Sequence, residues 1–188
     1  MFKYKKIKNF LETDFAEFIV DYFILKTNMT IDCSENQNNF LNYFFYSDNL
    51  TETILHNSCD SVNEITGMDL VQSYTYSGVY TKGDEIFNHK NKDTEKIEGF
   101  LFLGSENNKE KIYLSESDDC SNLIYEELEP GDLFLFDGHK YWHWIDSLED
   151  KWSVRSFLYF IEKKEGNENL IYDRRPYLGF PKQYSINT

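Results

Sequence analysis

Short apolar runs rich in aromatic residues, separated by turn residues, fill the second half of the chain and constrain its fold most strongly. Aromatic and β-branched side chains favour strands, and the pair Pro130 and Gly131 predicts a turn between two of the runs. We therefore predict a β-rich core over residues 69–165. The runs are LVQSYTYSGVY (70–80), IEGFLFLG (97–104), KIYLSES (111–117), DLFLF (132–136) and KWSVRSFLYFIEKK (151–164).

Two helical patterns precede this region. Apolar residues recur over residues 13–26 with the i, i+3, i+4, i+7, i+8 spacing of one helix face. A second pattern covers residues 49–66 and ends at Gly67, where a helix C-terminal glycine is expected. The polar stretch that begins at residue 27 is typical of a loop. Helices followed by strands with hairpin-like turns predict an α+β fold, in which the helices buttress an antiparallel sandwich or barrel.

The composition predicts one compact domain. The chain has 188 residues, of which 40% are hydrophobic and 18% aromatic, and this is enough for a sizeable core. We see no internal repeat and no linker. The expected organisation is a helical buttress and loop (1–68), a β core (69–165) and a C-terminal segment (166–188).

The net charge and the lack of long apolar runs disfavour some classes of binding partner. A formal net charge of −14 disfavours nucleic acid and anionic membrane surfaces, because both would repel the chain. No apolar run approaches the roughly 18 to 20 residues that span a bilayer, and no signal-peptide pattern follows the basic start MFKYKKIKNF. We expect a soluble cytoplasmic protein. Cys33, Cys59 and Cys120 are widely spaced and form no zinc pattern.

Two of the four histidines stand where a shared site is expected. His89 follows a Gly-Asp turn near a strand end, and His143 follows the DLFLF run after a short loop. Arg155 lies inside a later apolar strand, where a guanidinium is costly to bury unless it meets an anion. This order suits a metal with a bidentate anionic co-ligand whose far carboxylate the arginine holds. His56 lies in the second helical pattern and is expected to be a partly buried or surface histidine. His139 is expected to be an exposed loop residue that could exchange roles with His143.

From about residue 10 to residue 180 the sequence resembles the 2-oxoglutarate- and iron(II)-dependent oxygenases, specifically the prolyl-4-hydroxylase-like members. SYTYSGVYTKGDEIFNHKNKD (73–93) is similar to a family stretch in which a Tyr-rich strand leads through a Gly-Asp turn to His-x-Asp. LEPGDLFLFDGHKYWHW (128–144) is similar to the family's Pro-Gly-Asp turn, strand, glycine and His-Trp pair. The resemblance implies a double-stranded β-helix, or jelly-roll barrel, with Fe(II) near one mouth.

The resemblance also implies an activity and assigns roles to residues. The implied reaction is hydroxylation of a peptidyl or small-molecule substrate, with 2-oxoglutarate and O2 as cosubstrates. His89 and His143 match the iron-binding histidines, and Arg155 matches the residue that binds the distal carboxylate of 2-oxoglutarate. Tyr80 or Tyr76 is expected to donate a hydroxyl to the cosubstrate.

The sequence departs from the family pattern in the pocket more than in the scaffold. Asn91 stands at the metal position where the family has aspartate, Gly78 where an arginine is usual, and Lys92 where an arginine follows the aspartate.

Residues 33–49 are a candidate lid over the site. Arg155 could instead pair with a buried carboxylate such as Asp137 or Asp146. A cupin-like jelly roll with different metal chemistry would need more histidines in strand positions.

Asn91 allows three interpretations. In the first, the neutral amide oxygen of Asn91, which is a weaker ligand than a carboxylate, coordinates the metal weakly. In the second, a nearby carboxylate, Asp93 or Glu95, replaces Asn91 as the ligand. In the third interpretation the site holds no iron, and the chain is a catalytically inactive descendant that acts as a binding module. This last interpretation predicts a pocket filled by side chains such as Phe87 or Trp142.

Overall fold

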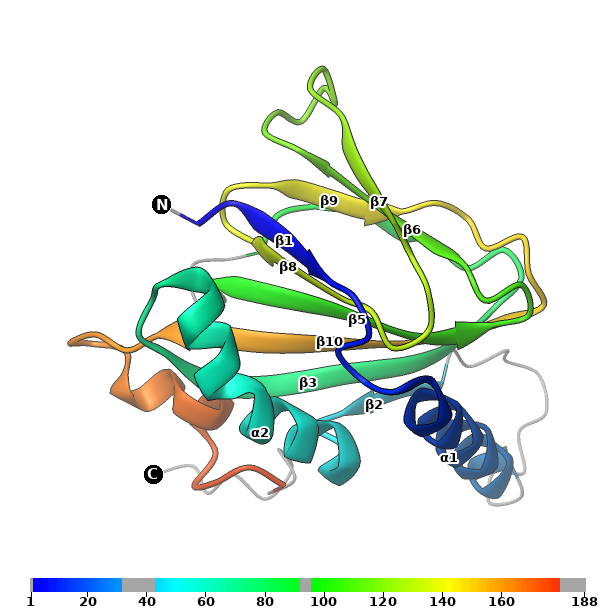
Figure 1. Cartoon of the computed structure of the whole chain (residues 1–188). Coiled ribbons are helices and arrows are strands. Elements are labelled where there is room, and N and C mark those ends of the chain that lie inside the picture. Colours follow the sequence, from blue (N-terminus) through cyan, green and yellow to red (C-terminus); the bar gives the residue numbers. More distant parts are fainter. Residues whose placement is uncertain (1, 32–42, 92–95, 180–188) are drawn as a thin grey trace.

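The computed structural model describes residues 2–31, 43–91 and 96–179 (Figure 1). The elements follow in the order β1 (Tyr4–Ile7), α1 (Thr13–Ile31), β2 (Tyr43–Tyr46), α2 (Asn49–Thr66), β3 (Leu70–Thr81), β4 (Ile86–His89), β5 (Ile97–Ser105), β6 (Glu110–Ser115), β7 (Ile124–Leu128), β8 (Leu133–Asp137), β9 (Trp142–Ile145), β10 (Trp152–Glu162) and the 3₁₀ helix η1 (Glu168–Arg174). The candidate lid, 33–49, lies partly outside the described residues, and its described part contains β2 and the start of α2.

Both predicted helices form. The second has the predicted bounds: the Asp48 side chain accepts a hydrogen bond from the backbone of Leu50, and Gly67 ends the helix in the left-handed conformation at φ 67°. The first continues beyond its apolar pattern to Ile31, so the interpretation of residues 27–31 as loop was wrong. Thr27 shows how a polar residue is accommodated there, because its hydroxyl donates to the carbonyl of Ile24 at 2.6 Å, within the preceding turn.

The strands form two antiparallel sheets. The larger has the strand order β1-β8-β5-β10-β3-β2, and the smaller has the order β4-β9-β6-β7. The smaller sheet lies over one face of the larger, and both helices lie on the opposite face (Figure 1). The predicted α+β class with mainly β structure is confirmed, and the arrangement is compatible with a jelly roll. Among the described strands, neither sheet closes on itself into a barrel.

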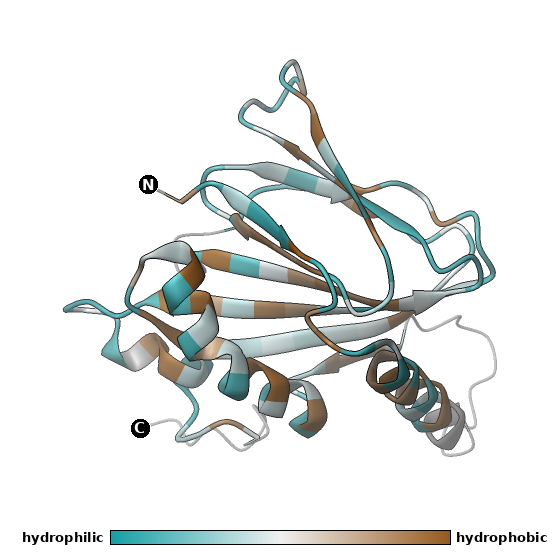
Figure 2. Cartoon of the chain, in the orientation of Figure 1, coloured by the Kyte–Doolittle hydropathy of each residue, from teal (hydrophilic) through white to brown (hydrophobic). Residues whose placement is uncertain are grey.

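Alternation along the central strands separates two apolar cores. On β8, Leu133 and Leu135 face the helices, whereas Phe134 and Phe136 face the smaller sheet. The same division runs along β5 and β10, so the first core joins α1 and α2 to the larger sheet and the second fills the space between the sheets. Hydrophobic residues accordingly occupy most of the length of β5 and β8 (Figure 2). Strands buried on both faces explain why their runs are continuously apolar.

Two segments, β1 and η1, had no clear sequence signal. β1 pairs with β8 at the edge of the larger sheet, although the basic N-terminal sequence shows no strand pattern. η1 is followed by Arg175, whose guanidinium forms a buried ion pair with Glu52 of α2, and this contact attaches the C-terminal segment to the helix.

Within residues 2–31, 43–91 and 96–179, no helix combines the length and the apolar character needed to cross a membrane.

The predicted Pro130–Gly131 turn carries a testable constraint. Gly131 has φ 87°, and a Cβ added to it would lie 2.2 Å from the carbonyl oxygen of Leu11. Gly131→Ala should therefore lower stability by about 2 kcal/mol or more, from the left-handed backbone and the contact with Leu11 together. For a chain of this length that corresponds to a fall in Tm of about 4–8 °C, measured by circular dichroism.

Gly166→Ala is the matched control. Gly166 has a similar φ of 91°, but no atom lies within 4 Å of the place that a Cβ would occupy. This variant should show only the backbone cost of about 1 kcal/mol. Equal changes in Tm for the two variants would show that the contact with Leu11 contributes nothing.

Candidate functional site

The two predicted histidines are cross-strand neighbours. His89 ends β4 and lies opposite His143 of β9, with a register irregularity between Ile86 and His89. The ring centroids are 4.2 Å apart. A local irregularity of this kind re-aims a side chain and is common beside active sites. The structure therefore brings together two histidines that lie more than fifty residues apart in the sequence.

Backbone carbonyls fix the tautomer of both rings. His89 Nδ1 lies 2.7 Å from the carbonyl oxygen of Phe87, and His143 Nδ1 lies 3.3 Å from that of Tyr141. Because a carbonyl can only accept a hydrogen bond, Nδ1 carries a proton in each ring, and in the neutral form of the ring Nε2 keeps its lone pair. Metal-binding histidines are usually oriented in this way, with the other ring N–H bound to a carbonyl or carboxylate.

His143 is neutral at physiological pH. Its side chain is almost completely buried, and burial lowers its pKa from 6.5 to about 4 against a smaller opposing effect of the hydrogen bond to Tyr141. Its Nε2 accepts no hydrogen bond. A neutral imidazole with a free lone pair in the protein interior is suited to bind a metal ion.

A carboxylate that the sequence did not single out lies beside this pair. Glu98 of β5 is 1% exposed, and its Oε2 lies 3.4 Å from His143 Nε2. That distance would suit an ion pair if His143 were protonated, but the lowered pKa of His143 makes the neutral ring the dominant form. The carboxylate is placed there because Glu98 shares the inner face of β5 with Phe100 and Phe102, towards the smaller sheet.

Asn91 faces Glu98 through its amide nitrogen. Its Nδ2 donates a hydrogen bond of 2.7 Å to Glu98 Oε2, and its backbone N–H donates to the carbonyl of Gly138 at 3.1 Å. The amide packs directly on Gly138, where a Cβ would lie 2.3 Å from Nδ2. Asn91 is thus held as a hydrogen-bond donor to the carboxylate. The alternative carboxylates, Asp93 and Glu95, lie outside the described residues.

The cluster is not already arranged as a complete metal site. Within the part of the chain that the structure describes, no three His, Cys, Asp or Glu side chains converge closely enough to hold an ion. His143 and Glu98 are buried, whereas the His89 side chain is exposed. Of these three side chains, that of His89 alone is exposed to solvent.

The other candidate residues lie around this cluster or away from it. His139 is in the turn between β8 and β9, and His56 lies on α2, where its ring is near Gln72. Phe87 is 76% exposed and so does not fill the interior. Trp142 is half-buried, with Lys90 over its ring.

Arg155 lies inside the molecule on the inner face of β10, and its partner is Glu110. The side chain is fully buried, and its Nε donates to Glu110 Oε2 at 2.7 Å and to Ser153 Oγ at 3.2 Å. Nη2 is 2.7 Å from the same Glu110 oxygen but lacks hydrogen-bond alignment, and Nη1 has no partner. Arg155 thus pairs with a buried carboxylate, as the alternative interpretation expected, but the partner is Glu110 and not Asp137 or Asp146.

Two tyrosines lie near this arginine. The Tyr80 ring stacks under the Arg155 guanidinium at 4.3 Å, and burial raises the pKa of Tyr80 more than Arg155 lowers it. Tyr76 stacks on Phe44 of β2, with ring centroids 5.2 Å apart, and burial raises its pKa too. Both hydroxyls therefore stay protonated and can act as donors. Phe44 also covers Gly78, whose added Cβ would lie 2.5 Å from the ring, so no larger side chain fits there.

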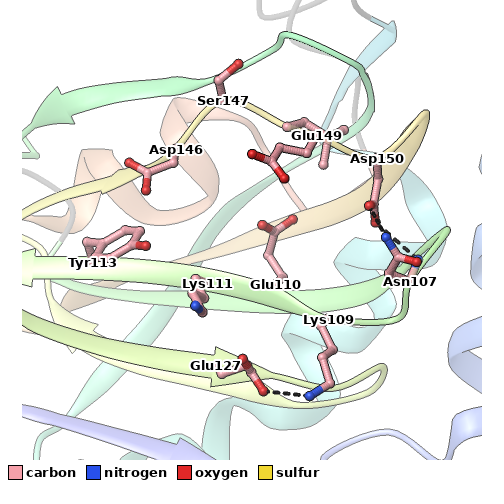
Figure 3. A pocket seen from close by; sticks show the side chains of 11 residues that line it. Asn107, Lys109, Glu110, Lys111, Tyr113, Glu127, Asp146, Ser147, Glu149 and Asp150 are labelled. Atoms are coloured by element: carbon pink, nitrogen blue, oxygen red, sulfur yellow. Dashed lines mark hydrogen bonds and ion pairs between the residues drawn. The ribbon is translucent and has the colours of Figure 1, made fainter.

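Glu110 also faces an open hollow of about 380 Å³ between β6 and the segment that follows β9. Figure 3 shows its carboxylate pointing towards this segment, on the side of Glu149 and Asp150. Arg155 does not line the hollow. Glu110 therefore stands between the buried guanidinium and the solvent-accessible space.

Comparison with known proteins finds similar folds among solved structures but no match to a family model or a curated protein. Among solved structures, a prolyl-4-hydroxylase from Pseudomonas putida has a TM-score of 0.63 at 12% identity, covering 87% of this chain and 95% of that one. HygX from Streptomyces hygroscopicus, with nickel and 2-oxoglutarate bound, has a TM-score of 0.63 at 9% identity, with coverages of 86% and 83%.

A third similar structure is the viral collagen prolyl hydroxylase of Paramecium bursaria Chlorella virus-1 in complex with 2-oxoglutarate. Its TM-score is 0.58 at 11% identity, covering 84% of this chain and 95% of that one. The chain thus has the fold of the 2-oxoglutarate- and iron(II)-dependent oxygenases, which confirms the resemblance stated from the sequence. Identities this low establish the fold alone.

Sequence reasoning missed Glu98 and Glu110. A signal for Glu98 existed, because a single acid within the apolar run IEGFLFLG raises the same question as Arg155 within its strand. Glu110 had no such signal, since it begins a strand after a polar turn and resembles a solvent-exposed residue. Its contact with Arg155 spans 45 residues of sequence and follows only from the packing of the two sheets.

The Arg155–Glu110 pair predicts a stability effect. Glu110→Gln removes the charge that compensates a fully buried guanidinium, so the free energy of unfolding should fall by about 3 kcal/mol. Urea denaturation followed by tryptophan fluorescence measures this change. Glu127→Gln is the control, because Glu127 forms an exposed pair with Lys109, and exposed ion pairs contribute little to stability. Similar losses in both variants would contradict a structural role for the buried pair.

Proposed function

We propose that this protein is a 2-oxoglutarate- and Fe(II)-dependent dioxygenase with a double-stranded β-helix core, which hydroxylates a peptidyl or small-molecule substrate. One observation carries the proposal. His89 and His143 face each other across β4 and β9, each with Nδ1 bound to a backbone carbonyl and the lone pair left on Nε2. The fold of known oxygenases supports the same conclusion.

The residues present fit an iron ion. The buried Nε2 of His143 has no hydrogen-bond partner, and imidazole nitrogen is a normal ligand for ferrous iron. His143 and His89 would hold the metal. When bound, iron and 2-oxoglutarate supply the oxidative chemistry, while the protein binds and orients the reactants.

The residues also fit the cosubstrate. The guanidinium of Arg155 is buried, and its Nη1 and Nη2 donate no hydrogen bond; a carboxylate is the anion that best matches its planar fork. Arg155 would therefore hold the distal carboxylate of 2-oxoglutarate. Tyr80 stacks on this guanidinium and Tyr76 lies on the same strand, so their protonated hydroxyls are available to orient the bound acid.

One observation favours a second function. Glu110 already neutralises Arg155 with a carboxylate of the protein's own, so a keto acid must compete with it. If Glu110 keeps this position, the chain is a binding module on an oxygenase fold and not an enzyme. The two functions differ in whether 2-oxoglutarate reaches Arg155.

Anaerobic titration with Fe(II) and 2-oxoglutarate tests the proposal. We expect the visible charge-transfer band of an iron–keto acid complex in the native protein. His143→Ala should abolish the band because it removes a buried metal ligand, and His139→Ala should keep it because His139 lies in the turn between β8 and β9.

Variants of Glu110 separate the two functions. Glu110→Gln frees Arg155 for the cosubstrate, so it should increase the affinity for 2-oxoglutarate, measured at a temperature where the variant is folded. A band in Glu110→Gln and none in the native protein would indicate the binding module. No band in either protein would rule out the oxygenase.

A further inference from the structure

We infer that Glu98 supplies the carboxylate of the metal site, and that Asn91 is a positioning residue for Glu98 and not itself a ligand. The inference rests on the proposed function and identifies the third ligand of that site. It assigns the carboxylate to β5, whereas a His-x-Asp motif would supply it two residues after His89.

The distance between Glu98 and His143 is the first argument. Oε2 of Glu98 and Nε2 of His143 are 3.4 Å apart, and Nε2 is buried without a hydrogen-bond partner. A ring nitrogen with no hydrogen bond therefore faces a buried carboxylate in the protein interior. Two ligands at about 2.1 Å from one ion, separated by roughly 90–110°, lie roughly 3.0–3.4 Å apart. The pair has the spacing of two ligands of one metal.

The orientation of Asn91 is the second argument. Its amide nitrogen donates to the same oxygen of Glu98 at 2.7 Å, so the amide supports the carboxylate that faces His143. Hydrogen bonds of this kind hold ligating carboxylates in many metal sites. Gly138 keeps the amide in place, because only a residue without Cβ leaves room for Nδ2.

The same contact explains the loss of aspartate. A carboxylate at position 91 would lie against the Glu98 carboxylate at hydrogen-bond distance, and two like charges in a buried site repel. Asparagine removes this repulsion and adds a donor. Glu98 meanwhile restores the negative charge that aspartate would contribute to iron. Asn91 and Glu98 are therefore a matched pair, and Asn91→Asp should not improve the site.

His89 completes the set of ligands. Its ring is exposed and adjoins that of His143, so it can move towards an ion that His143 and Glu98 hold. A site that assembles fully only with the metal accounts for the lack of a preformed three-residue cluster among the described side chains.

Metal affinity is the direct test. Mn(II) binding to the full chain is measured by isothermal titration calorimetry under anaerobic conditions, and the ligand-field spectrum of Co(II) reports the ligand set. Glu98→Gln, which preserves size and can still meet Asn91, should weaken Mn(II) binding by about 100-fold or more and change the Co(II) spectrum. Asn91→Asp should weaken binding about 10-fold, as expected for a disturbed supporting contact. Circular dichroism of the metal-free variants checks that they fold.

Two controls separate this inference from the proposed function. Glu116→Gln removes an exposed carboxylate that pairs with Lys140 and should leave Mn(II) affinity unchanged. If His143→Ala abolishes binding while Glu98→Gln does not, the inference is wrong and the proposed function stands. Tighter binding by Asn91→Asp would also overturn the inference and restore position 91 as the ligand. If the native protein binds neither metal, with or without 2-oxoglutarate, the proposed function fails as well.

Discussion

The pairing of β5 with β10 at the centre of the larger sheet determines both the cores and the candidate site. Each strand is buried on two faces, and alternation sends one set of side chains to the helices and the other to the smaller sheet. Glu98 and Arg155 belong to the inner set. A shift of one residue in either strand would move a charge into the helix-packed core. The register that packs the apolar residues is therefore the register that places the charged ones.

The face of the larger sheet that meets the smaller sheet combines an aromatic core with a few buried polar groups, which lie at two positions along the strands. Phe100 and Phe157 pack against each other at 5.1 Å, with Glu98 and His143 near one end of these strands and Arg155 and Glu110 further along. Apolar surroundings strengthen electrostatic interactions and make each unsatisfied polar atom costly. Nε2 of His143 and the terminal nitrogens of Arg155 are such atoms.

How much the sequence could predict depended on whether the signal was local. The two helices, the central strands and the Pro130–Gly131 turn follow from periodicity and turn chemistry, and the structure has them. His89, His143 and Arg155 could be selected from the sequence. The two histidines follow predicted strands or turns, and an arginine inside an apolar strand is costly to bury unless it meets an anion. The continuation of α1 to Ile31 had no local signal, because helix propensity in a polar stretch is weak.

Contacts between distant strands could not be predicted in the same way. Glu110 meets Arg155 only because β6 of one sheet packs over β10 of the other, and no periodicity in either strand encodes that meeting. Glu98 is seven residues from Asn91, but β4 and β5 belong to different sheets. Sequence spacing is a poor guide to distance between residues of different sheets.

A missing motif residue therefore has a different meaning in the sequence and in the structure. In the sequence, asparagine after His89 is a lost ligand, and it favours a weakened or inactive site. In the structure, the amide points its donor at a buried carboxylate that faces the second histidine. In the proposed site the negative charge comes from β5 and not from the position two residues after His89. Whether a metal centre survives a substitution depends on the total set of donors within reach of the ion, and that set is defined by the packing of strands rather than by the spacing of a motif.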